Sequence, residues 1–256
     1  MRLKGQVALV TGGGTGIGRG ISLAFAREGA SVAVNYQKSR EKAEDTVRRI
    51  REGGGRAIAV QADVRREADC KQLVDAVVRE WGQLDVLVNN AGWTQFVPHQ
   101  DLDALTDEIW RTVLDTNLLG AWYCIKHAAP VMRGHGRGVI INVTSVAAFS
   151  GKGSSVAYAA SKAALGSLTR SLARVLGPTI RINSLAPGLV ETDWWAGASP
   201  AVFEAARREV STPDLPTAED CGEAALFLAA EARATTGTTI FVDGGIIPLQ
   251  PRTPTR

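Results

Sequence analysis

The chain has 256 residues, 45% of them hydrophobic, with a formal net charge of +3. This composition is ordinary for a globular protein, and no basic block interleaved with aromatic residues indicates a nucleic-acid partner. No apolar stretch reaches about 18 residues, and the N-terminus has no signal-peptide core, so the sequence favours neither membrane insertion nor secretion. Three widely spaced cysteines (Cys70, Cys124 and Cys221) fit neither a disulfide framework nor a CxxC motif. We therefore expect a cytoplasmic protein that acts on a small molecule.

Short apolar runs alternate with longer helical patterns along the chain. The runs predict strands near 6–11, 31–35, 56–61, 84–89, 138–144, 179–185 and 238–242, with amphipathic helices between the first six. This alternation is typical of parallel strands joined by helical crossovers, and strands that are apolar throughout are covered on both faces. The sequence therefore predicts a single-domain α/β fold, a doubly wound parallel sheet of about seven strands with helices on both faces.

A glycine-rich run, Val-Thr-Gly-Gly-Gly-Thr-Gly-Ile-Gly-Arg-Gly, follows the first strand and precedes a helical pattern. Unpaired N–H groups and the positive end of the helix dipole attract anions at such a turn. Gly12, Gly16 and Gly18 have GxxxGxG spacing instead of the commoner GxGxxG spacing. We predict a loop that holds the pyrophosphate of a dinucleotide; a plain structural turn is the alternative.

Polar residues also follow the third and fourth strands. Asp63 and Val64 come after the third strand, and Asn90, Ala91 and Gly92 come after the fourth. Each segment has a structural alternative as a helix start or a turn. In open α/β sheets, however, ligands bind beyond the carboxyl ends of the strands. The position of these two segments directly after strands therefore favours a binding site.

Tyr158 and Lys162 are four residues apart in an alanine-rich helical pattern, which places them on one helical face. A nearby ammonium group is expected to lower the pKa of the tyrosine and make it a usable acid and base. Ser145 closes the fifth strand and can bring its hydroxyl near Tyr158. Asn117 is a polar residue in an otherwise apolar helical stretch, so it is either a satisfied buried amide or a functional group, or both.

Together the glycine loop, the Asn-Asn-Ala-Gly segment and the set Asn117, Ser145, Tyr158 and Lys162 resemble the short-chain dehydrogenase/reductase family, from Gln6 to Gly245. The resemblance implies a Rossmann-type domain over residues 1–247, a C-terminal tail over 248–256, and NAD(P)-dependent interconversion of a ketone and a secondary alcohol. It implies that Tyr158 protonates the carbonyl oxygen, Ser145 holds that oxygen, Lys162 binds the nicotinamide ribose and Asn117 orders a water. It also implies cofactor contacts from Gly12, Thr15, Gly16, Ile17, Gly18, Asp63, Val64, Asn90, Ala91, Gly92, Tyr158, Lys162, Pro187, Gly188, Val190 and Thr192.

The end of the second strand bears on the choice of cofactor. Sites that select the unphosphorylated dinucleotide place an acid there, whereas this chain has Asn35, followed by Tyr36, Lys38 and Arg40. We therefore expect NADP(H), with NAD(H) possible because Thr15 stands where many phosphate-selective relatives carry a basic residue. The alternative is that Lys38 and Arg40 are ordinary solvated charges.

A long connection over 188–216 interrupts the alternation of strands and helices and contains Trp194 and Trp195. Such connections are often functional, and we predict a lid in which these indoles, with Trp93, contact the substrate. Packing between subunits is the alternative for the indoles. The three histidines have no metal-like spacing, so no metal site is expected.

Two substrate classes fit these motifs. A carbonyl reductase similar to 3-oxoacyl-carrier-protein reductases is favoured over a sugar dehydrogenase similar to glucose 1-dehydrogenases. A dinucleotide-binding regulator without catalysis is a third possibility, because a fold by itself does not fix activity. The resemblance also implies a homotetramer, assembled through the helices carrying Asn117 and Tyr158 and through the last strand.

Overall fold

The computed structural model describes residues 1–196 and 198–247, and it contains one parallel sheet with the strand order β3-β2-β1-β4-β5-β6-β7. The strands are β1 Val7–Val10, β2 Ser31–Tyr36, β3 Arg56–Gln61, β4 Val86–Asn89, β5 Gly138–Val143, β6 Ile180–Pro187 and β7 Thr239–Val242. All seven predicted strands are present, and the predicted doubly wound fold is confirmed. The predicted tail over 248–256 lies outside the described residues.

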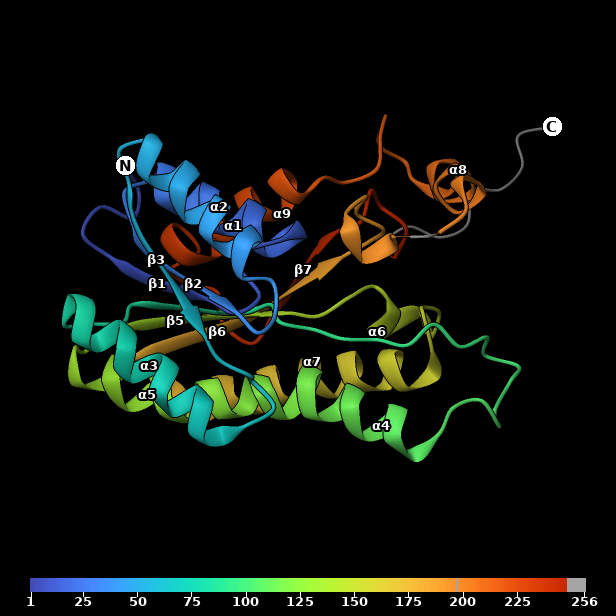
Figure 1. Cartoon of the computed structure of the whole chain (residues 1–256), viewed down its shortest axis with the longest axis horizontal. Coiled ribbons are helices and arrows are strands. Elements are labelled where there is room, and N and C mark those ends of the chain that lie inside the picture. The colour runs from blue at the N-terminus through green and yellow to red at the C-terminus, as the bar shows by residue number, and fades with distance from the viewer. Residues whose placement is uncertain (197, 248–256) are drawn as a thin grey trace.

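Helices cover both faces of the sheet (Figure 1). The helices are α1 Gly16–Arg27, α2 Arg40–Glu52, α3 Glu67–Trp81, α4 Asp107–Leu114, α5 Gly120–Gly134, α6 Ala147–Ser150, α7 Val156–Leu176, α8 Pro200–Glu209 and α9 Ala218–Ala230. Helices α1, α2 and α9 form the upper layer of Figure 1, and α3, α5 and α7 form the lower layer. Separate apolar cores fill the two layers, with Phe25 and Leu226 in one and Leu73 and Met132 in the other. The strands are apolar on both faces because each face packs against one of these cores.

The strand order reverses between β1 and β4. Val10 of β1 pairs with Val34 of β2 on one side and with Val88 of β4 on the other. The connections after β1 and β4 therefore leave the sheet in opposite directions, which opens a crevice at the carboxyl ends of these strands. This crevice positions the candidate site.

Helix starts differ in a way that matters for the site. Ser155 caps α7 by accepting a hydrogen bond from the Tyr158 backbone N–H (3.2 Å), and Thr217 and Asp220 form a capping box at α9. At α1, by contrast, the side chain of the N-cap residue Thr15 accepts no hydrogen bond from the first turn. Helices α2 and α3 likewise lack a side-chain cap, but only α1 begins at the glycine-rich loop, where its uncapped N–H groups are available to an anion.

The long connection between β6 and α9 contains a short 3₁₀ helix, η2 (Asp193–Trp195), and α8. Every residue of α8 is at least partly exposed, and this helix lies apart from the two covering layers in Figure 1. We call residues 188–196 and 198–216 the lid segment; Gly197 lies outside the described residues.

Candidate active site

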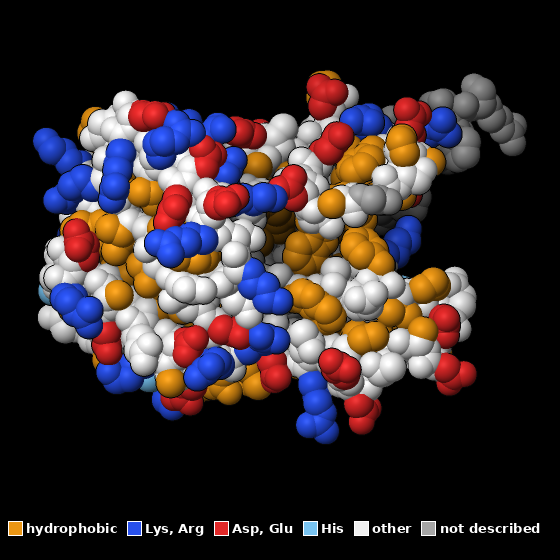
Figure 2. Space-filling view, viewed as in Figure 1, with side chains coloured by type: hydrophobic (Ala, Val, Ile, Leu, Met, Phe, Trp, Pro, Cys, Tyr) orange, Lys and Arg blue, Asp and Glu red, His pale blue; other side chains and the backbone are white. Residues whose placement is uncertain are grey.

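A cavity of about 800 Å³ runs along the carboxyl ends of the strands, and we call it the cleft. Figure 2 shows hydrophobic side chains gathered around a hollow on the right of the molecule. All but three of the predicted site residues line the cleft: Gly12, Thr15, Gly16, Ile17, Asn35, Tyr36, Lys38, Asp63, Val64, Asn90, Ala91, Gly92, Trp93, Ser145, Tyr158, Lys162, Pro187, Gly188, Val190, Thr192, Trp194 and Trp195. The three that lie outside its lining are Gly18, Arg40 and Asn117. Predicted residues from distant segments, between Gly12 and Trp195, therefore line one continuous cavity.

The glycine loop is shaped by close backbone approach. Gly12 and Gly16 have φ values of +59° and +49°, in the left-handed region that favours glycine. Gly18 lies behind the loop, where a Cβ atom would be 2.2 Å from the Gly12 carbonyl oxygen and 2.5 Å from Asn90 Nδ2. Gly18 thus lets helix α1 pack against the loop, and its contribution to a ligand is indirect.

Two amide side chains hold the glycine loop from behind, one buried and one partly buried. Asn35 Oδ1 accepts a hydrogen bond from the Gly12 N–H (3.2 Å), and Asn35 Nδ2 donates to the carbonyl oxygens of Val60 and Ala62 (both 3.2 Å). Asn90 Nδ2 donates to the carbonyl oxygen of Thr11 (2.9 Å). Asn35 lines the cleft, but its side chain is 2% exposed and its amide is engaged by backbone.

Of the two cations predicted after β2, one lines the cleft and the other does not. Arg40 donates from Nε to Glu44 on its own helix (2.7 Å) and does not line the cleft, which corrects its predicted place in the site. Arg65 lines the cleft instead and donates from Nε and Nη2 to the carboxylate of Asp63. This contact lowers the pKa of Asp63 below its usual value, so the carboxylate is charged and paired at neutral pH. Lys38 also lines this end.

Ser145, Tyr158 and Lys162 meet at the other end of the cleft. Lys162 is 4% exposed, donates from Nζ to the carbonyl oxygen of Val143 (2.8 Å), and lies 5.7 Å from the centre of the Tyr158 ring. The one-turn spacing on α7 and the end of β5 together create this arrangement. It resembles the expected set of a proton donor, a hydroxyl partner and an ammonium group.

The ionisation of this group differs from the expectation. Burial raises the pKa of Tyr158 to about 12, and hydrogen bonding to Ser145 offsets only part of that rise. Burial also lowers the pKa of Lys162 to about 8. The prediction that the pKa of Tyr158 lies below its ordinary value was therefore wrong for the chain without ligand, because burial raises this pKa more than the Ser145 hydrogen bond lowers it. Tyr158 carries its proton at neutral pH.

Asn117 lies beside this group in a π-helical turn, η1 (Asp115–Leu119), between α4 and α5. Its Oδ1 accepts from the Trp93 N–H (2.8 Å), and its Nδ2 donates to the Trp93 carbonyl oxygen (3.0 Å) and to Ser161 Oγ (3.0 Å). Asn117 is therefore a satisfied buried amide, as one of the two interpretations held. Its side chain fixes the backbone of Trp93, which lines the cleft.

The lid segment brings aromatic rings to the catalytic end. The Trp194 ring lies 5.9 Å from the Tyr158 ring, centre to centre. Trp195 packs instead on Phe96 (5.5 Å) and Phe203 (6.4 Å). The two adjacent indoles thus have different contacts, although both line the cleft.

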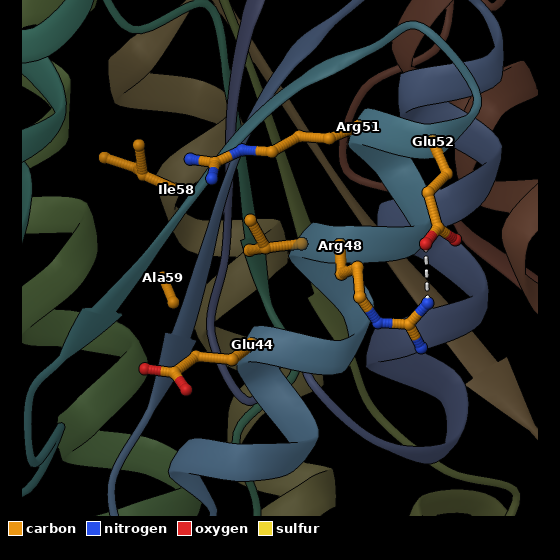
Figure 3. A pocket seen from close by; sticks show the side chains of 7 residues that line it. Glu44, Arg48, Arg51, Glu52, Ile58 and Ala59 are labelled. Carbon is orange, nitrogen blue, oxygen red and sulfur yellow. Dashed lines mark hydrogen bonds and ion pairs between the residues drawn. The ribbon is translucent and has the colours of Figure 1, made fainter.

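A second hollow, of about 700 Å³, lies between α2 and the edge strand β3 (Figure 3). Its charged side chains are engaged by neighbours, with Arg48 donating to Glu52 (2.7 Å) and Arg51 donating to the Ala57 carbonyl oxygen (2.8 Å). None of the residues predicted to act in catalysis lines it. The first cavity is therefore the candidate active site.

Sequence reasoning missed several residues that line the cleft. They are Gly14, Gln37, Ser39, Ala62, Arg65, Thr112, Thr116, Val143, Thr144, Val146, Ala147, Ser150, Lys152, Gly153, Ser154, Leu189, Asp193, Ala206, Glu209, Ile246 and Ile247. Arg65 and Gln37 had a usable signal, because each is close in sequence to a predicted site residue. Glu209 and Ile246 had none, because only the folded lid segment and the turns after β7 bring them to the cleft.

Comparisons with known proteins agree with this site. The family model described as enoyl-(acyl carrier protein) reductase matches residues 12–247. A ketoacyl reductase assigned to the granaticin polyketide synthase of Streptomyces violaceoruber is 42% identical over 244 residues, covering 94% of this chain and 96% of its own. The 3-oxoacyl-[acyl-carrier-protein] reductase of Staphylococcus aureus is 39% identical over 241 residues, covering 93% and 97%.

Solved structures also match over most of the chain. A protein from Burkholderia xenovorans assigned to the short-chain dehydrogenases/reductases matches with a TM-score of 0.89 and 35% identity, over 95% of this chain and 98% of its own. A 7α-hydroxysteroid dehydrogenase complexed with NADH and 7-oxo glycochenodeoxycholic acid matches with a TM-score of 0.87 and 33% identity, over 95% of each chain.

The described residues contain neither a candidate metal cluster nor a candidate membrane span. In the described part of the chain, no group of three or more His, Cys, Asp or Glu side chains could hold a metal ion. No helix among residues 1–196 and 198–247 has the length and apolar character needed to cross a bilayer.

The fold, the cleft and the relatives lead to one assignment: the chain belongs to the short-chain dehydrogenase/reductase family and is an NAD(P)-dependent oxidoreductase.

Proposed function

We propose that this enzyme reduces a ketone to a secondary alcohol, as a carbonyl reductase of the 3-oxoacyl type. The observation that carries the proposal is the buried group at the catalytic end, where Tyr158 is protonated at neutral pH beside Ser145 and Lys162. A protonated phenol is a proton donor, which is the role that carbonyl reduction requires. The named relatives that act on ketoacyl groups support the same direction of reaction.

The residues fit a bound dinucleotide. The N–H groups of the first turn of α1 have no side-chain cap, so they suit a pyrophosphate. Because Gly18 has no side chain, α1 can pack directly against the glycine loop. Gly12, Gly16, Ile17 and Thr192 would surround the phosphates, with Pro187, Gly188 and Val190 near the nicotinamide. When bound, the nicotinamide supplies the hydride that adds to the carbonyl carbon.

The chain's own residues carry the proton and hold the carbonyl. Ser145 donates a hydrogen bond to the carbonyl oxygen, and Tyr158 donates its proton to that oxygen as charge develops there. Lys162 places a positive charge beside the phenolate that remains, and it binds the nicotinamide ribose. Asn117 fixes the Trp93 backbone through its side chain and orders a water for proton return.

The test separates carbonyl reduction from its alternatives. We expect the purified chain to oxidise NADPH with an acetoacetyl thioester, which has a ketone, and not with a crotonyl thioester, which has only a C=C bond to reduce. Glucose with either oxidised cofactor tests the sugar dehydrogenase. If the enzyme turned over only the crotonyl thioester or only glucose, the proposal of carbonyl reduction would be contradicted. Tight dinucleotide binding without turnover of any substrate would favour the non-catalytic regulator.

We place NADP(H) as the preferred cofactor, with Lys38 as the cation that binds the 2′-phosphate. Lys38 lines the cleft after β2, where no acid repels a phosphate, whereas Arg40 is paired with Glu44 outside it. We expect Lys38→Ala to lower the kcat/KM ratio of NADPH over NADH about tenfold, the effect of about 1.4 kcal/mol. Arg40→Ala is the matched control and should leave the ratio unchanged; a wild-type preference for NADH would contradict the assignment.

We also propose an oligomeric state and a cellular location for this protein. A homotetramer is supported by the exposed large apolar side chains of Trp122 on α5 and Phe227 on α9, and by β7, which is an edge strand. Light scattering on the purified chain measures this state, and a monomer would contradict it. All three cysteines are buried free thiols, which fits a reduced compartment such as the cytoplasm.

A further inference from the structure

We infer that the natural substrate is a 3-oxoacyl-type ketone that also carries a flat, apolar ring system, and that this ring lies against the indole of Trp194. The inference rests on the proposed function and names its substrate class. It starts from the position of Trp194, whose ring is 5.9 Å from the ring of Tyr158 and inclined to it by 50°. A carbonyl that accepts the Tyr158 proton must lie at this place, so the group bearing that carbonyl contacts the indole.

Trp194 is exposed although it lies over the catalytic tyrosine. Its surface is 38% exposed and lines the cleft, so a ligand that covers the indole removes apolar area from water. Flat rings gain most from such a contact, because stacked or tilted ring pairs at 4.5–7 Å add about 0.5–1.5 kcal/mol beyond burial. An open acyl chain gains only the burial.

Contacts on both sides of Trp194 position the lid segment. On one side, Asp193 accepts from Lys42 Nζ of α2 (2.6 Å). On the other side, Trp195 packs on Phe96 and Phe203. These contacts are individually weak, but together they orient the lid segment with the Trp194 ring beside Tyr158.

Apolar and charged side chains both line the cleft. Val146, Leu189 and Ile246 are apolar, whereas Lys152 and Glu209 are charged. Two hydroxyls of the lining already have partners: Ser150 Oγ donates to the Val146 carbonyl oxygen (3.1 Å), and Ser154 Oγ is hydrogen-bonded to Thr94 Oγ1 (2.7 Å). The apolar side chains suit the ring part of the substrate, because they remove its apolar area from water.

The experiment compares two ketones with ten carbons each, the flat bicyclic 1-tetralone and the open-chain 2-decanone, with NADPH in excess. We expect the wild type to have at least about tenfold higher kcat/KM for 1-tetralone, as one lost ring contact of about 1.4 kcal/mol corresponds to tenfold. Trp194→Leu keeps an apolar side chain and removes the flat face. It should lower kcat/KM about tenfold for 1-tetralone, mostly through KM, and change 2-decanone less than about threefold.

Two further variants complete the design. Trp194→Phe keeps a flat ring and should retain most of the preference. Trp81→Leu is the matched control, since Trp81 lies at the end of α3 and outside the cleft lining, and it should change neither ketone. An equal loss for both ketones in Trp194→Leu, or a wild type that prefers 2-decanone, would overturn the inference. In that case reduction of 2-decanone or of the acetoacetyl thioester would leave the proposed function standing; reduction of no ketone would remove the proposed function itself.

Discussion

The two ends of the cleft are built from different kinds of contact. At the glycine-loop end, side chains that are buried or partly buried bond to backbone: Asn35 holds Gly12, and Asn90 holds Thr11. At the lid end, exposed aromatic rings and the exposed Lys42–Asp193 ion pair position the lid segment. Buried amide contacts to backbone tolerate little change, because any loss leaves an unpaired polar group. Exposed contacts can be exchanged at small cost.

The difference suggests a division of roles. The glycine-loop end fits one constant ligand part, the pyrophosphate and adenosine of a dinucleotide. The lid end fits the variable part, the substrate, because side chains there can change without disturbing the sheet. The predictions below test this comparison from the largest expected effect to the smallest.

Removing the Tyr158 hydroxyl should have the largest effect. Tyr158→Phe keeps the ring and loses the proton donor, so we expect kcat to fall about 10³-fold, within the range for general acid catalysis. The Kd for the dinucleotide should change less than about threefold, because the hydroxyl serves the carbonyl. Steady-state assays measure kcat, and titration calorimetry measures the Kd for the dinucleotide. Tyr123→Phe on α5 is the control, and substantial turnover in Tyr158→Phe would remove Tyr158 from its proposed role.

Filling the space at Gly18 should damage the glycine-loop end. A Cβ atom there would be 2.2 Å from the Gly12 carbonyl oxygen, whereas one at Gly134 would have no neighbour within 4 Å in the described structure. We expect Gly18→Ala to lower the free energy of unfolding by about 3 kcal/mol and to weaken dinucleotide binding. Gly134→Ala should be neutral or stabilise by less than about 1 kcal/mol. Denaturant unfolding measures both, and equal values for the two variants would contradict the rigid end of the comparison.

Lys162 should make stability depend on pH at the catalytic end. Its pKa is about 8 in the folded chain and 10.5 when exposed. Between these values the unfolded chain holds a proton that the folded chain lacks, so the free energy of unfolding rises with pH. Relative to Lys162→Met, the wild type should gain about 3 kcal/mol from pH 7 to pH 11. Urea unfolding at several pH values measures the difference, and a difference independent of pH would show that the buried lysine keeps its ordinary pKa.

The ion pair between the lid segment and α2 should have the smallest effect. Lys42 and Asp193 are both exposed, and such pairs contribute less than about 1 kcal/mol. We expect Lys42→Ala, Asp193→Ala and the double variant to give a coupling free energy of about 0.5 kcal/mol that disappears at high salt. A coupling of several kcal/mol would mean that the lid end is as rigid as the glycine-loop end.

The sequence by itself determined the sheet and most of the cleft. Strands such as β5 are recognisable because a strand buried on both faces must be apolar throughout. Gly12, Gly16 and the pair Tyr158 and Lys162 are equally recognisable, because a loop conformation and a helical face depend on residues only a few positions apart. The spacing of neighbours along the chain contains that information.

Tertiary structure alone decided which side chains face the cleft and how they ionise. Arg40 turned to Glu44 while Arg65 lined the cleft, and Asn35 turned inward to Gly12. The pKa of Tyr158 is raised by burial, which depends on packing from distant segments and which the hydrogen bond to Ser145 only partly offsets. Trp194 and Trp195 are neighbours in sequence, yet only the folded lid segment placed one on Tyr158 and the other on Phe96. Desolvation and ring contacts depend on atoms brought together across the whole chain, and no local pattern specifies them.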